Sequence, residues 1–239
     1  MNILVTGGSS GLGKAITELC ALKEDNTIYF TYSKNFVCKE EIEKNFSNTK
    51  GIQLDFKDNN SISNFINIIP DLNLDVLVNN AYAEAPQGTY FHKTSSEDFS
   101  RSFQYNLIPV IRLTQACILA FRKKRFGKII NVLTSSLLDL PPIGYSMYTA
   151  NKAYLAQLSK CWCKENAKFN ITSNCVLPEY MQTAFAEVDE RILEQMKQDH
   201  PLKQLLQPKD VAEVVVSLIY ASQQVNGVNL PINAAQHIL

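Results

Sequence analysis

The amino-acid sequence predicts an α/β fold in which a parallel sheet of seven strands is covered by helices on both faces. Short apolar runs alternate with amphipathic stretches along almost the whole chain. Several of these runs are apolar without alternation, which is typical of strands buried on both faces. Strands and helices that alternate in this order form parallel sheets, because each helix returns the chain to the same edge.

The predicted strands are the short apolar runs, at Ile3–Val5, Thr27–Tyr32, Gly51–Leu54, Asp75–Val78, Lys128–Leu133, Ile171–Leu177 and Val228–Ile232. The predicted helices lie between them, at Gly11–Lys23, Phe36–Phe46, Ser61–Ile69, Ser96–Lys123, Tyr148–Lys168 and Pro208–Ala221. No repeat or linker divides these elements, so residues 1–239 are predicted to form a single domain. The least regular segment, Glu179–Gln207, is predicted to be a variable insertion beside the substrate.

The composition excludes several classes of partner. Hydrophobic residues make up 46% of the 239 residues, enough for a large core, and Lys+Arg and Asp+Glu number 23 each. This balance favours neither nucleic acid nor an anionic membrane. No apolar run approaches membrane-spanning length, and Met1 and Asn2 lead directly into the first predicted strand, which leaves no room for a signal peptide. We therefore expect a cytoplasmic protein without a membrane partner.

The six cysteines show no spacing typical of metal ligands. We expect no metal site, and we interpret the cysteines as reduced thiols that act as small hydrophobic side chains.

The first chemical motif is the run Thr6-Gly7-Gly8-Ser9-Ser10-Gly11-Leu12-Gly13, which follows a predicted strand and opens a predicted helix. Glycines allow a tight turn and let the backbone approach a pyrophosphate closely. The start of the helix adds free N–H groups and a positive dipole end. The hydroxyls of Thr6, Ser9 and Ser10 add contacts or hold the turn. A turn without a ligand is the alternative, but the position between strand and helix favours a dinucleotide site.

The second motif is Tyr148-Thr149-Ala150-Asn151-Lys152, which places a phenol and an ammonium on the same face of a helix. A free phenol has a pKa of about 10, and a nearby cation lowers it. Lys152 is therefore predicted to lower the pKa of Tyr148 and make it a proton donor near neutral pH. Either motif alone is weak, whereas together they predict a nicotinamide site with its own proton donor.

Further residues complete a known pattern. Asn79-Asn80-Ala81 ends the fourth strand, Asn106 lies within a long helix, Ser135 precedes Tyr148, and the stretch from Pro178 to Thr183 follows the sixth strand. With these residues and its glycine spacing, the chain resembles the short-chain dehydrogenase/reductase family from Ile3 to about Ile232. The resemblance implies a Rossmann-type three-layer sandwich with a doubly wound, parallel seven-stranded sheet.

The resemblance also implies the roles of the site residues in reducing a ketone to a secondary alcohol. Tyr148 gives its proton to the carbonyl oxygen as hydride reaches the carbon, and Ser135 hydrogen-bonds the same oxygen. Lys152 holds the nicotinamide ribose, and Asn106 holds a water that links Lys152 to solvent. The cofactor-binding residues are expected to be Thr6, Gly7, Ser9, Ser10, Gly11, Leu12, Gly13, Ser33, Lys34, Asp55, Phe56, Asn79, Asn80, Ala81, Tyr148, Lys152, Pro178 and Thr183.

The catalytic hydroxyl has two candidates. Counting back from Tyr148 favours Ser135, whereas counting forward from Asn131 favours Thr134. We choose Ser135 as the prediction. The nearby Tyr145 has no lysine four positions later, so we expect it to line the substrate entrance.

The second strand indicates which cofactor is used. An acidic residue at its end binds the ribose of NAD, but here the strand ends at Tyr32, followed by Ser33 and Lys34. Both residues suit a 2′-phosphate, so we predict NADP(H) rather than NAD(H). Lys34 has an alternative as an ordinary surface lysine. Asp55 matches an adenine-contacting aspartate of the family and has an alternative as a helix cap.

Two residues depart from the family pattern beside the expected nicotinamide. Tyr82 replaces the glycine of N-N-A-G, and Glu179 replaces the glycine after Pro178. The Glu179 carboxylate contacts a polar substrate or points to solvent, and we favour solvent. Neither change removes a catalytic group.

The substrate pocket is expected between Glu84–Phe91, Leu137–Tyr145 and Glu179–Gln207. The apolar residues of the middle segment form either a wall for an acyl chain or ring, or a loop packed on its own core. The small carbonyl substrate is predicted to be a 3-oxoacyl thioester, with a keto-sugar of saccharide biosynthesis as the alternative. A dinucleotide-binding regulator without catalysis is the alternative of another class. The two longest predicted helices carry surplus apolar surface, which predicts a homo-oligomer, a dimer or a tetramer, and of these we favour a homotetramer.

Overall fold

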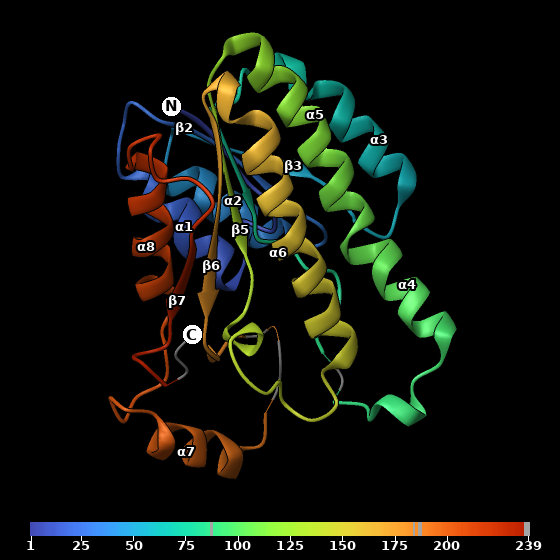
Figure 1. Cartoon of the computed structure of the whole chain (residues 1–239). Helices are drawn as coiled ribbons and strands as arrows, with labels where there is room; N and C mark the ends of the chain where they lie inside the picture. Colours follow the sequence, from blue (N-terminus) through green and yellow to red (C-terminus); the bar gives the residue numbers. More distant parts are fainter. Residues whose placement is uncertain (87, 184, 186–187, 237–239) are drawn as a thin grey trace.

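The computed structural model describes residues 1–86, 88–183, 185 and 188–236. Its centre is a parallel sheet of seven strands in the order β3-β2-β1-β4-β5-β6-β7 (Figure 1). The strands are β1 (Asn2–Val5), β2 (Thr27–Tyr32), β3 (Thr49–Gln53), β4 (Val76–Asn79), β5 (Gly127–Val132), β6 (Ile171–Pro178) and β7 (Asn229–Ile232). The predicted fold class is confirmed, and each observed strand lies within two residues of its predicted position.

The sheet is wound in two directions from its middle. The chain runs from β1 outward to β3 and then returns to β4 on the other side of β1. Leu4 pairs with Leu77 and Val5 with Val78, so β1 and β4 end side by side. In open sheets of this kind, ligands bind beyond the carboxyl ends of the strands where the winding reverses.

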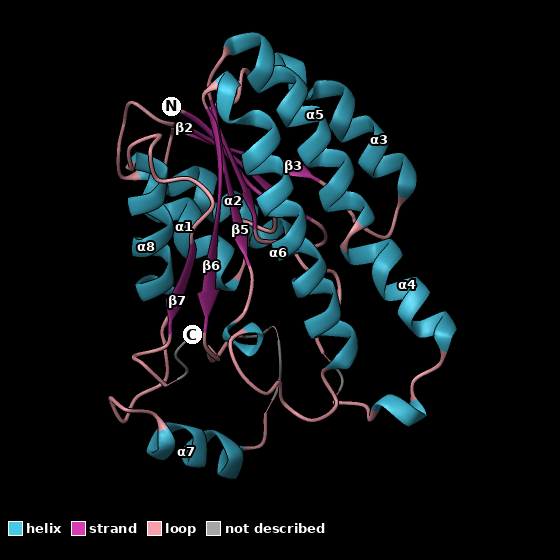
Figure 2. Cartoon of the chain, viewed as in Figure 1, coloured by secondary structure: helices cyan, strands magenta, loops and turns pink. Residues whose placement is uncertain are grey.

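Helices cover both faces of the sheet, so the molecule has three layers (Figure 2). One face carries α1 (Gly11–Ala21), α2 (Phe36–Asn45) and α8 (Pro208–Tyr220). The other carries α3 (Asn59–Ile68), α4 (Ser96–Asn106), α5 (Ile108–Lys124) and α6 (Ser146–Asn166). Short 3₁₀ helices lie at Ile69–Leu72, Phe91–Lys93, Ser135–Leu137 and Ala167–Phe169.

Both layers between sheet and helices are apolar because successive residues of a strand point to opposite faces. Leu4 and Leu77 belong to the core beneath α3 to α6, and Ile3 and Val5 belong to the core beneath α1, α2 and α8. This double burial explains why the strands are apolar without alternation. Among the described residues, no helix is long and apolar enough to cross a membrane.

Two predicted elements differ from the structure. The single helix expected at Ser96–Lys123 is interrupted at Leu107 and forms α4 and α5. Pro109, near the start of α5, lacks an N–H group and its ring obstructs the preceding turn, which explains the interruption. The irregular segment Glu179–Gln207 contains an additional helix, α7 (Glu190–Asp199). Ile192, Leu193 and Met196 lie on one side of this helix, but none of its described residues is buried, so α7 adds nothing to the core of the sheet.

Candidate active site

The candidate site lies at the carboxyl edge of the sheet, where β5 ends and α6 begins (Figure 1). The glycine turn and the end of β4 lie at the same edge. The turn between β1 and α1 requires glycine at several points. Gly7 and Gly11 have positive φ angles of 65° and 48°. A Cβ at Gly13 would overlap the carbonyl oxygen of Gly7 and lie 2.6 Å from Asn80 Nδ2. The chain is therefore as tightly folded here as the sequence predicts.

The start of α1 offers donors to an anion. Its N-cap, Ser10, makes no side-chain capping hydrogen bond, and both Ser10 and Gly11 are exposed. N–H groups of a first helical turn without such a cap are suited to a phosphate. A cradle in which a Cβ does not fit, next to an uncapped helix start, fits the pyrophosphate of a dinucleotide. Ser9 is buried beneath this turn, and the Leu12 side chain belongs to the core.

Thr6 and Asn80 hold the turn in place. The buried Thr6 hydroxyl donates to Val78 O (3.1 Å) and accepts from the N–H groups of Asn80 and Ala81 (3.0 Å each). Asn80 Nδ2 donates to Thr6 O at 2.9 Å. These bonds tie the glycine turn to the end of β4, so the Thr6 side chain acts as a support for the cradle.

Asn79, the residue before Asn80, is the last residue of β4 and is buried. Its Nδ2 donates to Thr114 Oγ1 (3.1 Å) and Asn131 Oδ1 (2.9 Å), and the residue is 3% exposed. The side chain is thus held inside the protein, where it joins β4 to β5 and α5.

The end of β2 presents the predicted cofactor-selective residues to solvent. Ser33 and Lys34 are both exposed beside the first strand. Asp55 Oδ1 accepts the N–H of Lys57 at 2.9 Å, whereas the cap of α3 is Asp58. The alternative interpretation of Asp55 as the cap of this helix is therefore wrong. The side chain of the next residue, Phe56, lies in the core.

The end of β6 returns to the glycine turn. Pro178 is the last residue of β6, and a Cβ placed on Gly11 would lie 3.6 Å from Thr183. The fold thus brings a predicted cofactor-binding threonine to a glycine that lies far away in the sequence.

Tyr148 and Lys152 lie on the same face of α6, as predicted. Lys152 Nζ is 5.6 Å from the centre of the Tyr148 ring and donates to Val132 O at 2.8 Å. Burial lowers the pKa of Lys152 to about 8. Burial also raises the pKa of Tyr148, and a hydrogen-bonding interaction with Thr134 only partly opposes this.

The predicted lowering of the Tyr148 pKa is therefore wrong for the protein by itself. The penalty for placing a phenolate in an apolar interior is the largest cause of the raised pKa, and the neighbouring Tyr82 and Tyr145 add to it. The phenol keeps its proton at neutral pH, as a free phenol does, and burial makes it a weaker acid until positive charge is brought close to it.

Asn106 ends α4 and is 2% exposed. Its Oδ1 accepts the N–H of Ala83 at 2.7 Å, and its Nδ2 donates to Ser102 O at 3.0 Å. These bonds join α4 to the segment after β4. The predicted role in holding a water stays a prediction.

The three consecutive hydroxyls after β5 point to different partners. Thr134 interacts with Tyr148 and donates to Ser136 Oγ at 3.2 Å. Ser135 instead donates to Glu179 Oε2 at 2.6 Å. Thr134 thus remains a candidate beside the phenol, and the interpretation that Glu179 points to solvent is wrong because its carboxylate accepts from Ser135.

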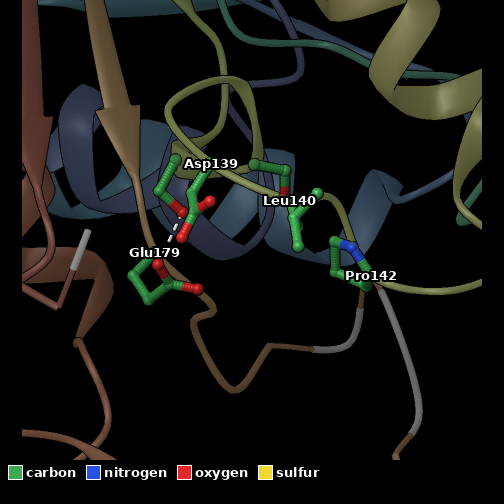
Figure 3. Close-up of a pocket in the computed structure, with 6 residues that line it drawn as sticks. Asp139, Leu140, Pro142 and Glu179 are labelled. Atoms are coloured by element: carbon green, nitrogen blue, oxygen red, sulfur yellow. Dashed lines mark hydrogen bonds between the residues drawn. The ribbon is translucent and has the colours of Figure 1, made fainter. Parts of the chain in front are cut away.

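A small pocket of about 50 Å³ lies beside these hydroxyls, lined by Ser135, Ser136, Asp139, Leu140, Pro142 and Glu179. Figure 3 shows Asp139 and Glu179 together on one side, with Leu140 and Pro142 beyond them. The pocket combines carboxylates with an apolar wall. The replacement of glycine by Glu179 was the sequence signal for the polar side.

The segments predicted to frame the substrate lie near one another. Gly88 packs against Gly144, which joins the first segment to the second. Leu137 and Leu138 pack on the core, whereas Leu140 is 87% and Ile143 is 74% exposed. The middle segment thus combines both alternatives. Its first half is packed on the core, and its second half leaves apolar side chains exposed where they can form a wall for the substrate. Within the expected frame, residues 87, 184, 186 and 187 lie outside the described residues.

The geometry agrees with comparison to known proteins. The family described as short chain dehydrogenase matches residues 1–192. The chain belongs to the short-chain dehydrogenase/reductase family. The predicted family is therefore confirmed, and the match covers the glycine turn, Tyr148 and Lys152.

Curated members of this family are similar over most of their length. A 3-oxoacyl-[acyl-carrier-protein] reductase FabG of Aquifex aeolicus (strain VF5) is 30% identical over 223 residues, covering 90% of this chain and 88% of that protein. An acetoacetyl-CoA reductase of Rhizobium meliloti (strain 1021) is 32% identical over 222 residues, covering 90% and 89%.

Solved structures of the family share the fold. A putative betaketoacyl-ACP reductase is 26% identical with a TM-score of 0.84, covering 98% of this chain and 96% of that one. A short chain dehydrogenase from Burkholderia cenocepacia J2315 in complex with NADP is 24% identical with a TM-score of 0.84, covering 97% and 96%. The second likeness shows the fold alone.

Proposed function

We propose that this chain is an NADP(H)-dependent reductase that converts the ketone of a 3-oxoacyl thioester into a secondary alcohol. The observation that carries the proposal is the placement of the Tyr148 phenol, which lies one helical turn before Lys152 on the same face of α6, with the Lys152 ammonium 5.6 Å from its ring centre. A protonated phenol suits proton donation, which is the chemistry of reduction. Relatives named as reductases of 3-oxoacyl-[acyl-carrier-protein] and of acetoacetyl-CoA support the substrate class.

Each chain residue has a defined part in this reaction. Bound NADPH supplies the hydride that adds to the carbonyl carbon. Tyr148 hydrogen-bonds the carbonyl oxygen and delivers its proton there as the alkoxide forms, so the alcohol leaves and a phenolate remains. The Lys152 ammonium stabilises this phenolate until solvent returns the proton. Thr134, which already interacts with the phenol, is placed to hydrogen-bond the same oxygen.

The proposed cofactor is NADPH because no acidic residue ends β2. Ser33 and Lys34 are exposed at this end and are available to a 2′-phosphate. Thr183, beside Gly11, is proposed to close the cradle over the pyrophosphate.

A keto-sugar is the second candidate substrate. Asp139 and Glu179 line the pocket next to Ser135, and carboxylates accept hydrogen bonds from sugar hydroxyls. The exposed Leu140 and Ile143 favour the acyl substrate instead.

We also propose a homo-oligomer. An apolar groove between α4 and α6, lined in part by Phe99, Phe103 and Tyr154, supports pairing of these helices across a two-fold axis. A sedimentation mass of one 26.9 kDa chain at micromolar concentration contradicts this proposal. The proposed compartment is the cytoplasm, a choice supported by six cysteines that are all unpaired.

The test of the function is NADPH oxidation with a panel of acetoacetyl-CoA, longer 3-oxoacyl thioesters, keto-sugars and simple ketones. Tyr148→Phe is the control, since it keeps the ring and removes the transferred proton. We expect turnover of the thioesters that falls at least a thousandfold in the variant. Equal turnover in wild type and variant overturns the proposed mechanism, and turnover of keto-sugars alone selects the second substrate class. NADPH binding without any turnover across the panel favours a non-catalytic regulator.

A further inference from the structure

Tyr82 contacts both of the groups that perform the chemistry. Its ring meets that of Tyr148 edge to face, with centres 5.2 Å apart and planes inclined by 71°. Lys152 Nζ is 5.0 Å from the centre of the Tyr82 ring, closer than the 5.6 Å that separates it from the centre of Tyr148. Tyr82 is therefore the nearer aromatic contact of the buried ammonium.

The ammonium benefits from this ring. Lys152 is 6% exposed, and its hydrogen bond to Val132 O occupies one of three donors. Removing a cation from water is costly, which is why burial lowers its pKa. The negative face of an aromatic ring within about 6 Å recovers part of this cost, and the gain is largest where water is excluded.

Other side chains hold the Tyr82 ring in place. Asn151 Nδ2 donates to the Tyr82 hydroxyl (3.0 Å) and to Ser102 Oγ (2.9 Å). Ser102 also accepts from Asn106 Nδ2, and Asn106 Oδ1 accepts the N–H of Ala83, the residue after Tyr82. The ring is thus anchored through its hydroxyl to α6 and through the adjacent backbone to α4. A side chain fixed at both ends holds its neighbours at constant distances.

We propose that Tyr82 is a positioning residue of this active site, whose ring face holds the Lys152 ammonium and whose edge aligns the Tyr148 ring. It acts through these two residues. The inference rests on the proposed function for what Tyr148 and Lys152 do, but the arrangement itself is testable without turnover. The resemblance to the family gives no such role to this position, where its pattern has glycine.

The first experiment measures the titration of the Lys152 ammonium by NMR in the full-length protein. The titratable groups that face it are Tyr148 on the same helix, Tyr82 after β4, and Cys175 of β6. Tyr82→Leu keeps an apolar filling and removes the ring, while Tyr82→Phe keeps the ring and removes the hydroxyl. Both variants lose the bond to Asn151, so their difference isolates the ring.

We expect the midpoint of Lys152 to fall by about one pH unit in Tyr82→Leu, the tenfold change expected of one desolvated cation–π contact. In Tyr82→Phe it stays within a few tenths of a unit of wild type. An unchanged midpoint in a folded Tyr82→Leu protein overturns the inference. If Tyr82→Leu does not fold, the Tyr82→Phe variant alone decides. A Lys152 midpoint one pH unit below wild type in Tyr82→Phe overturns the inference, because the ring is then present and does not stabilise the charge.

The second experiment compares kcat and the Kd for NADPH. Tyr82→Leu is expected to lose about tenfold in kcat with a Kd within twofold of wild type, and Tyr82→Phe to recover most of kcat. Tighter NADPH binding and faster turnover in Tyr82→Leu mean that the ring obstructs the cofactor, which overturns the inference. Failure of the proposed function is seen separately, as a wild type that turns over no faster than Tyr148→Phe.

Discussion

The geometry of the glycine turn makes Gly13→Ala a sharp test of the cofactor cradle. An added Cβ would overlap the Gly7 carbonyl oxygen, and it would lie 2.8 Å from the Gly7 carbonyl carbon and 2.6 Å from Asn80 Nδ2. Two of these atoms are backbone, and the third side chain is hydrogen-bonded to Thr6. Relief of the overlap therefore requires movement of the turn itself.

The expected magnitude follows from two opposing effects. Overpacking of this kind costs about 1–3 kcal/mol. Alanine regains up to about 1 kcal/mol of helix propensity, since Gly13 lies in the first turn of α1. The overlap here is with backbone atoms, which places the cost in the upper part of this range, at about 2–3 kcal/mol. The net loss of about 1–2 kcal/mol lowers Tm by about 2–8 °C for a chain of this size. A turn displaced by about 1 Å is expected to weaken NADPH binding by about tenfold to a hundredfold.

The assays are thermal unfolding and NADPH fluorescence titration, with Gly127→Ala as the matched control. At Gly127 an added Cβ would overlap the Phe121 ring, at the opposite end of the sheet from the site. This control is expected to lose similar stability and keep its NADPH affinity. A Gly13→Ala protein with wild-type Tm and Kd refutes the steric reasoning. Equal loss of affinity in both variants assigns the effect to general destabilisation.

Three further predictions concern single side chains. Thr134→Val is expected to lower kcat by about a hundredfold and Ser135→Ala by less than tenfold, because Thr134 reaches the phenol; the reverse order returns the role to Ser135. Lys34→Glu is expected to lower kcat/KM for NADPH relative to NADH by at least tenfold, with Lys123→Glu as the surface control; an unchanged ratio leaves Lys34 an ordinary surface lysine. The lowered pKa of Lys152 is tested by urea titrations of wild type and Lys152→Met at a series of pH values. The difference between their free energies of unfolding is expected to rise in favour of wild type between about pH 8 and pH 10.5. In this range the folded protein has released the Lys152 proton and the unfolded chain retains it. The difference is flat below pH 8, and a difference independent of pH throughout contradicts the lowered pKa.

Much of the site was predictable because its residues belong to local patterns. The glycines are identified by their place between a strand and a helix, and Tyr148 and Lys152 by their spacing on one helix. The approach of Thr183 to Gly11 followed only from resemblance, since nothing local in the sequence brings residues so distant together.

The errors in prediction come from effects that act through space. The pKa of Tyr148 depends on how much water the folded protein removes from around the phenol, which spacing does not report. The solvent-exposed interpretation of Glu179 failed for the same reason, because the bond from Ser135 depends on backbone direction after β5 and β6. The choice of Ser135 over Thr134 stays a prediction. Counting residues cannot resolve two adjacent hydroxyls on a turning backbone.

By itself, the sequence determined the sheet, the order of its elements and the glycine cradle. The spacing of apolar residues, the residue types that form turns and the steric limits of the backbone all act over a few neighbouring residues. Only the tertiary structure decided that Glu179 faces Ser135 and that the Tyr82 ring covers Lys152. These contacts join residues from different strands and helices. Their existence depends on how the layers pack, and packing is a property of the whole fold.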